Sequence, residues 1–176
     1  MTRLLGAILL CLVATAPVHA SESPWDPARA GKIECFGSNL TSKTCDTMTV
    51  YRWLDDGTVE ADTRSPNEAL APGVVVLSRW RASIKGNTNC STMLKSDVEA
   101  NTFEQDGQLV SDADTIKYRR KMTDRLSEMF GRTYCRRIGK YGREYTAQIT
   151  IDGREMPSDA NWLAWIDKTD GFTLSP

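Results

Sequence analysis

The stretch "EYTAQITIDG", residues 144–153, decides the fold class that the sequence predicts. Apolar residues occupy every second position from Tyr145 to Ile151, and polar residues stand between them. Successive side chains of a strand point to opposite faces, so this alternation is typical of a strand with one buried face. Asp152-Gly153 then supplies the positive φ angles that tight hairpin turns require. The stretch therefore predicts a strand that turns back toward an antiparallel neighbour.

The same pattern recurs on both sides of this stretch. Three more Asp-Gly pairs punctuate the chain, beginning at positions 56, 106 and 170, and the longest alternating run covers residues 74–84. Shorter candidate strands cover residues 32–36, 48–54, 58–63, 94–104 and 162–167. Strands joined by short turns pair antiparallel, so we expect an antiparallel sheet of about six or seven strands.

Residues 111–130 do not alternate in this way and predict one long helix. They contain no proline or glycine, Ser111 or Asp112 can cap the first turn, and Gly131 follows as a stop signal. Apolar residues recur at roughly helical spacing, at Ile116, Met122, Leu126, Met129 and Phe130. An apolar stripe of this kind packs on a sheet. We therefore expect an α+β fold in which an amphipathic helix lies on an antiparallel sheet.

The first twenty residues have the pattern of a secretory signal peptide. Arg3 precedes an apolar run over residues 4–14, and the segment ends with small residues up to Ala20. The run is shorter than the roughly 20 apolar residues that span a bilayer, and no later stretch approaches that length. We expect a signal peptide at residues 1–20, a flexible lead-in at 21–31 and a single α+β domain at 32–176. The mature protein would then be periplasmic or secreted, without a transmembrane segment.

Cleavage of the signal peptide would remove His19, the only histidine of the chain. Without an imidazole, the mature protein would have no Ser-His or Cys-His nucleophile, no histidine base and no histidine-ligated metal. We therefore expect no catalytic residue, no metal and no cofactor.

Four cysteines would remain after cleavage: Cys35, Cys45, Cys90 and Cys135. The exported compartment is oxidising and no C-x-x-C pair is present, which favours two disulfides over a zinc site. Four cysteines allow three pairings. Of these we favour Cys35 with Cys45, which closes a short polar loop, and Cys90 with Cys135.

A basic block covers residues 117–144, where ten Lys and Arg residues stand against three acidic ones in a chain of formal net charge -1. We expect a non-catalytic binding module with an exposed surface for an anionic envelope component or an acidic protein. Its candidate residues are Lys117, Arg120, Lys121, Arg125, Arg136 and Arg137. Nucleic acid is not expected, because no nucleic-acid motif is present.

Two alternatives remain open for the function of the chain. In the first, the basic residues pair with the acidic strands inside a structural envelope protein. In the second, two carboxylates face one another across a cleft and serve a hydrolase.

Several motifs together resemble a known family. They are "ECFGSNLTSKTC" at residues 34–45, the single cysteines Cys90 and Cys135, "ITIDG" at 149–153 and the closing "DGFTLSP". This combination resembles a family of small exported four-cysteine proteins of alphaproteobacteria whose function is not established. The resemblance implies a bacterial periplasmic location and no particular activity.

Overall fold

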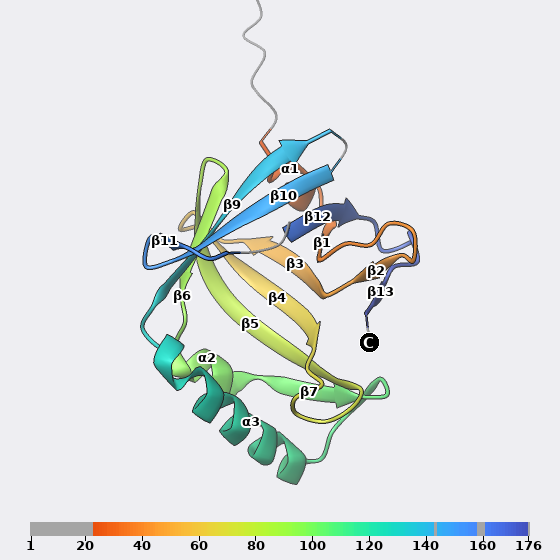
Figure 1. Cartoon of the computed structure of the whole chain (residues 1–176), viewed down its shortest axis with the longest axis vertical. Coiled ribbons are helices and arrows are strands. Elements are labelled where there is room, and N and C mark those ends of the chain that lie inside the picture. Colours follow the sequence, from red (N-terminus) through yellow and green to blue (C-terminus); the bar gives the residue numbers. More distant parts are fainter. Residues whose placement is uncertain (1–22, 143, 158–160, 176) are drawn as a thin grey trace, which may run out of the picture.

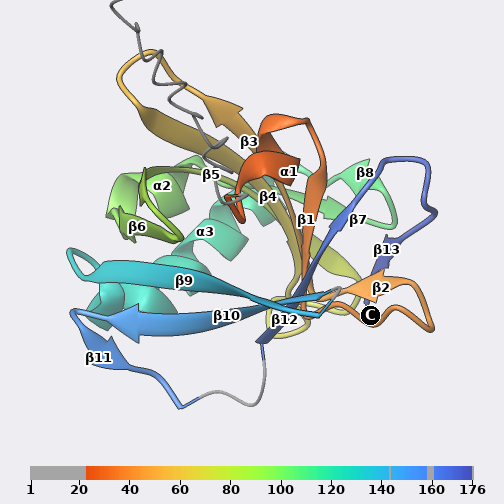
Figure 2. The same cartoon turned by 90° about the horizontal axis from the view of Figure 1, so that it is seen from above.

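The computed structural model describes residues 23–142, 144–157 and 161–175, so the predicted signal peptide lies outside the described residues. Eight strands form a closed antiparallel barrel (Figures 1 and 2). In chain order they are β1 (Ile33–Phe36), β3 (Thr47–Trp53), β4 (Thr58–Pro66), β5 (Val74–Lys85), β6 (Thr88–Thr92), β9 (Thr133–Tyr141), β10 (Glu144–Ile151) and β12 (Asn161–Ile166). Each strand pairs with the next in this series, and β12 closes the ring on β1, with Ile166 opposite Ile33.

The predicted α+β architecture, an open sheet of six or seven strands with a long helix packed on it, is wrong. Each of these eight strands pairs with two others, and the β4–β5 pairing completes the ring, so the barrel has no open edge. Alternating residues identify strands but carry no information on whether the first strand meets the last. That contact depends on the twist and tilt of the whole sheet.

Short strands extend the barrel wall. A parallel pair, β2 (Thr44–Cys45) with β13 (Thr173–Leu174), lies beside the barrel, and β11 (Arg154–Glu155) pairs with β10. The long strand β5 pairs with β6 near its end and with β7 (Thr102–Gln105) near its start, and β7 continues into β8 (Gln108–Leu109). Between β6 and β7 the chain forms the helix α2 (Lys95–Ala100), where we had predicted a strand over residues 94–104.

The predicted helix at residues 111–130 forms as α3 (Asp112–Leu126), followed by the short 3₁₀ helix η1 (Ser127–Met129). The Ser111 hydroxyl caps it, accepting a hydrogen bond of 3.2 Å from the Asp114 amide. The buried Tyr118 packs the helix against Phe103 of β7, with the two ring centroids 5.4 Å apart. Ile116, which we expected to lie on the sheet, is 61% exposed. In Figure 1, α2 and α3 lie together below the barrel.

The opposite end of the barrel is filled by residues that we had assigned to the flexible lead-in. The short helix α1 (Asp26–Arg29) lies at this end (Figure 1), and the neighbouring Trp25 is fully buried. Trp25 packs in the main core with Ala28, Tyr51, Val59, Ala61, Ala82, Ile138 and Leu163. The described part of the lead-in is therefore part of the core.

Two of the Asp-Gly pairs form the tight turns that the sequence predicts. Asp106 and Gly107 join β7 to β8 with φ angles of 53° and 76°, and Asp152 and Gly153 join β10 to β11 with 49° and 77°. Both residues of a type I′ turn need positive φ, which glycine and aspartate tolerate better than most residues.

No helix of the described part of the chain is long and apolar enough to cross a lipid bilayer.

Candidate functional site

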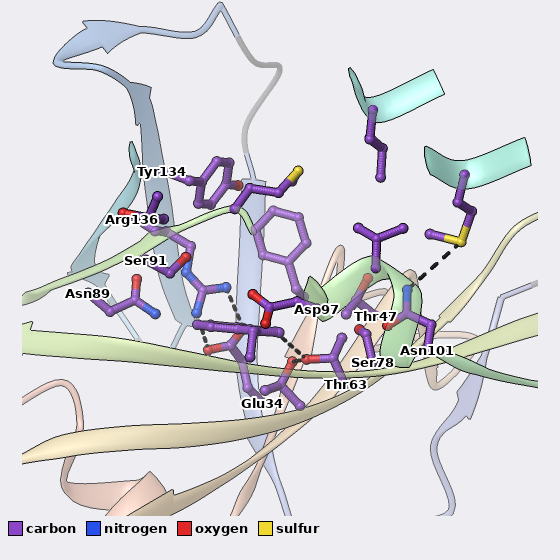
Figure 3. A pocket seen from close by; sticks show the side chains of 18 residues that line it. Glu34, Thr47, Thr63, Ser78, Asn89, Ser91, Asp97, Asn101, Tyr134 and Arg136 are labelled. Carbon is purple, nitrogen blue, oxygen red and sulfur yellow. Dashed lines mark hydrogen bonds and ion pairs between the residues drawn. The ribbon is translucent and has the colours of Figure 1, made fainter. Parts of the chain in front are cut away.

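The main core fills the barrel interior at the α1 end, and a second buried cluster packs β5 and β7 against α3. A cavity of about 360 Å³ lies at the end that α2 and α3 cover. Inward-facing residues of the barrel strands form its walls: Glu34, Phe36, Thr47, Thr49, Thr63, Ser78, Trp80, Asn89, Ser91, Tyr134 and Arg136. The exposed Thr92, at the end of β6, also lines it. The segment from Met93 through α2 and the helix α3 contribute Met93, Asp97, Val98, Asn101, Met122 and Leu126. Figure 3 shows these side chains converging on one space.

A buried charged cluster borders the cavity where it meets the packed core. The Arg136 guanidinium donates through Nη1 to Glu34 Oε1 at 2.5 Å and through Nη2 to Glu34 Oε2 at 2.7 Å. Tyr51 joins the cluster, since its hydroxyl donates to Glu34 Oε2 at 2.8 Å and accepts from Arg136 Nη2 at 2.7 Å. Two parallel bonds between a guanidinium and a carboxylate fix both side chains in place.

Burial and neighbouring charges shift the pKa values of Arg136, Tyr51 and the nearby Tyr134. Burial alone would lower the pKa of Arg136, but the attraction of Glu34 and Tyr51 outweighs it, so this pKa lies above its usual value. Burial, and then the charge of Glu34, raise the pKa of the Tyr51 hydroxyl well above 10.0. Burial likewise raises the pKa of Tyr134. At neutral pH Arg136 is therefore charged and both tyrosines are neutral.

Glu34 is fully engaged by its neighbours. Its two carboxylate oxygens accept three hydrogen bonds from Arg136 and Tyr51. Glu34 is only 1% exposed. A general base must reach the proton of its substrate, and both Glu34 oxygens already face Arg136 and Tyr51. The cluster is therefore better suited to organising the cavity than to transferring protons.

The α2 side of the cavity carries two polar side chains one helical turn apart, Asp97 and Asn101. Asp97 is partly buried, and no described residue donates a hydrogen bond to its carboxylate. Asn101 is 4% exposed; its Nδ2 donates weakly to the Met122 sulfur at 3.9 Å, while its Oδ1 is buried without a donor. A buried acceptor without a partner is uncommon in folded proteins.

The structure confirms the predicted disulfides. Cys35 is bonded to Cys45, joining β1 to β2, and Cys90 is bonded to Cys135, joining the paired strands β6 and β9. Cys35 and Cys45 are fully buried, and they form a small core of their own with Ile166.

The six residues of the predicted partner surface are distributed over two regions. Lys117, Arg120 and Arg125 are exposed on α3, and Lys121 is exposed there too, although its Nζ donates to the Leu70 carbonyl at 3.2 Å. Arg137 is exposed on β9, where it is hydrogen-bonded to Gln148. Arg136 is 8% exposed inside the barrel, so the prediction that it contributes to an exposed surface is wrong. Alternate residues of a strand face opposite sides, which separates Arg136 from Arg137.

Ion pairs on the outer wall involve other basic residues. Arg52 and Arg79 pair with the acidic residues Glu60 and Asp62 across β3, β4 and β5. Among the described residues, no salt bridge involves Lys117, Arg120 or Arg125. In the alternative of a structural envelope protein, the basic residues pair with acidic residues of the strands. Arg136 forms such a pair with Glu34, whereas Lys117, Arg120 and Arg125 of α3 form none with the described residues.

The cavity and its polar residues were not predicted from the sequence. One signal for Arg136 is present in the sequence, since Tyr134 and Ile138 flank it at alternate positions and place it on an apolar face. Its partner Glu34 is a lone acid between isoleucine and cysteine, and nothing local links the two residues. Asp97 and Asn101 were hidden because their segment was interpreted as a strand.

The cavity offers few ligands for a metal ion. Within residues 23–142, 144–157 and 161–175, no three acidic, histidine or cysteine side chains gather closely enough to bind one. In comparisons with known proteins, no family model, curated protein or solved structure matches this chain.

Proposed function

We propose that this protein is an exported, non-catalytic binding module that takes up a small molecule inside its barrel. The observation that carries this proposal is the cavity of about 360 Å³ at the α2 and α3 end. An eight-stranded barrel is wide enough either to be filled by side chains or to enclose one small ligand. Here the interior around Trp25 is filled, and a cavity remains at the end that α2 and α3 cover.

The composition of the cavity wall supports binding over catalysis. Ligand pockets combine an apolar lining with a few convergent polar groups, and their volumes run from about 300 to 1,000 Å³. A carboxylate hydrolase needs two available carboxylates. Of the two acidic residues that line the cavity, Glu34 is held by Arg136 and Tyr51, which leaves Asp97 alone.

Export is supported by two observations. The first twenty residues have the pattern of a cleaved signal peptide. The two disulfides suit an oxidising compartment.

Binding of the neutral fluorescent probe N-phenyl-1-naphthylamine to the purified protein tests the cavity. Its fluorescence should rise and saturate at one probe per chain. Ser78 lines the cavity from β5, so Ser78→Phe should fill part of the space and abolish the rise. Ser83 is exposed on the same strand, so the matched variant Ser83→Phe should bind as the parent does. Equal binding by both variants, or no saturable binding, would refute a ligand site in the barrel.

A second binding surface is proposed on α3, for an anionic envelope component or an acidic protein. The supporting observation is that the exposed Lys117, Arg120 and Arg125 form no salt bridge with any described residue. Exposed charges without an internal partner are available to attract an oppositely charged surface. Arg136 and Arg137 do not belong to this surface.

A further inference from the structure

We propose that the barrel cavity selects a small amphiphilic amine, whose protonated amino group binds at Asp97 and Asn101. This inference rests on the proposed function, because it names the class of ligand for the same cavity. It follows from the charges that line the cavity, from two acceptors that lack donors, and from the apolar residues beside them.

The charge balance of the cavity is negative. Four ionisable residues line it: Glu34, Asp97, Tyr134 and Arg136. Glu34 and Arg136 neutralise one another through two hydrogen bonds, and burial raises the pKa of Tyr134, which keeps that side chain neutral. Asp97 therefore contributes the remaining charge. Asp97 would repel an anionic ligand and attract a cation. Arg136 Nε is buried without a partner, but the charge of this guanidinium is already balanced by Glu34.

Two acceptors in and beside α2 lack donors. Asp97 lies in α2 and Asn101 is the residue that follows its last turn, and both line the cavity. Figure 3 shows both of them among the residues that surround the cavity. No described residue donates to the Asp97 carboxylate, and the Asn101 Oδ1 atom is buried without a partner. An ammonium group carries three donors and no acceptor, which complements this pair of oxygens.

The rest of the α2 and α3 side suits a hydrocarbon or aromatic group. Met93 and Val98 line the cavity near Asp97, and Met122 and Leu126 line it from α3. Trp80 contributes an indole ring from β5. Methionine side chains adapt to ligands of varied shape. A molecule with one amino group and a short apolar body therefore matches the wall.

Three probes that share an eight-carbon chain test this inference: n-octylamine, 1-octanol and octanoate at pH 7, measured by titration calorimetry or by displacement of N-phenyl-1-naphthylamine. The amine should bind about tenfold or more tightly than the alcohol, since a hydrogen bond to a charged group is stronger than one to a neutral group. Octanoate should bind most weakly. Tighter binding of octanol or octanoate than of octylamine would overturn the inference.

Asp97→Asn should weaken octylamine binding about tenfold or more and leave octanol binding within about twofold. The matched control is Glu99→Gln, because Glu99 is an exposed carboxylate on the same helix that pairs with Lys95. It should leave both ligands unchanged. Equal loss of the amine and the alcohol in Asp97→Asn would mean that Asp97 shapes the cavity without binding the amino group, which overturns the inference.

The two proposals fail in different ways. If none of the three probes binds the protein, and N-phenyl-1-naphthylamine binding is the same in Ser78→Phe and Ser83→Phe, the cavity is not a ligand site and both proposals fall. If octanol and octanoate bind in the cavity but the amine has no advantage, the proposed function stands and only the inferred ligand class is wrong.

Discussion

Arg136 of β9 is clamped by two hydrogen bonds, of 2.5 and 2.7 Å, to Glu34 of β1, a residue 102 positions earlier in the chain. Two strands, β12 and β10, separate β1 from β9 on the shorter way around the ring, so the bond runs across the interior. It marks the boundary between the packed core around Trp25 and the cavity. This pair therefore connects strands β1 and β9 across the interior, between the main core and the cavity.

Removing one member of the pair should destabilise the fold strongly. Arg136→Met leaves Glu34 as a buried charge with only the Tyr51 hydroxyl as a donor, and breaking a buried ion pair in this way costs about 3–5 kcal/mol. Urea unfolding followed by tryptophan fluorescence measures this loss.

The double variant Glu34→Leu/Arg136→Met should cost less than the sum of the two single variants, because it leaves no unpaired charge. Arg137→Met is the neighbouring surface control and should change the free energy of unfolding by no more than about 0.5 kcal/mol. A loss for Arg136→Met as small as that of the control would mean that the pair contributes little.

Acid should weaken the junction between β9 and β10. Hydrogen bonds from the Arg132 side chain, at 2.8 Å, and from the Thr133 amide lower the pKa of Asp152 below 3.8. A lowered pKa in the folded state gives a contribution to stability that is present above the unfolded value. It is lost as the pH falls through the folded pKa.

The variant Asp152→Asn should therefore be less stable than the parent at pH 7, and the difference should shrink as the pH is lowered below 3.8. Unfolding curves recorded between pH 7 and pH 2 measure it. In an Arg132→Met background the pH dependence of this difference should be smaller, since the main donor is gone. A difference that grows toward low pH would contradict the sign.

Local features of the fold were predictable from the sequence because local rules govern them. The strand at residues 144–151 has the predicted bounds, Ser111 caps α3 as expected, and both disulfide pairings are those that we favoured. Alternation, capping and turn chemistry act over a few residues. The rest of the fold therefore does not override these local preferences.

The closure of the barrel and the cavity were not predictable in the same way. The strand β9 carries three basic residues, which hid its alternation inside the basic block and led us to place Arg136 on the surface. The contact between Glu34 and Arg136 requires the whole ring to close. The cavity is set by the volume left between side chains of eight strands and two helices, which no sequence pattern encodes.

Loss of the disulfide between β6 and β9 should lower stability without changing the fold. Cys90 and Cys135 are 45 residues apart, and a loop of this length gives a loss of about 2–4 kcal/mol when the crosslink is removed. Urea unfolding of Cys90→Ala/Cys135→Ala measures it under non-reducing conditions. The near-ultraviolet circular dichroism of the folded double variant should match that of the parent. A loss below about 1 kcal/mol would show that the unfolded chain already keeps these two segments close together.

Vesicle binding tests the surface that α3 presents. Lys117, Arg120 and Arg125 are exposed and lack ion pairs with the described residues, so the triple change to glutamate should abolish binding to phosphatidylglycerol vesicles. It should cost little stability, because exposed charges contribute less than about 1 kcal/mol each. Cosedimentation with vesicles and thermal unfolding measure the two effects.

The control for this surface makes the same change of charge elsewhere, with glutamate in place of the exposed Lys85, Arg154 and Lys168. If α3 is the docking surface, this control should retain most of the binding, although its net charge equals that of the α3 variant. Binding by the parent should weaken as salt rises from 0.1 to 1 M, where the Debye length falls from about 10 to about 3 Å. Equal loss in the two variants would mean that the vesicles respond to net charge alone, and the surface on α3 would have to be abandoned.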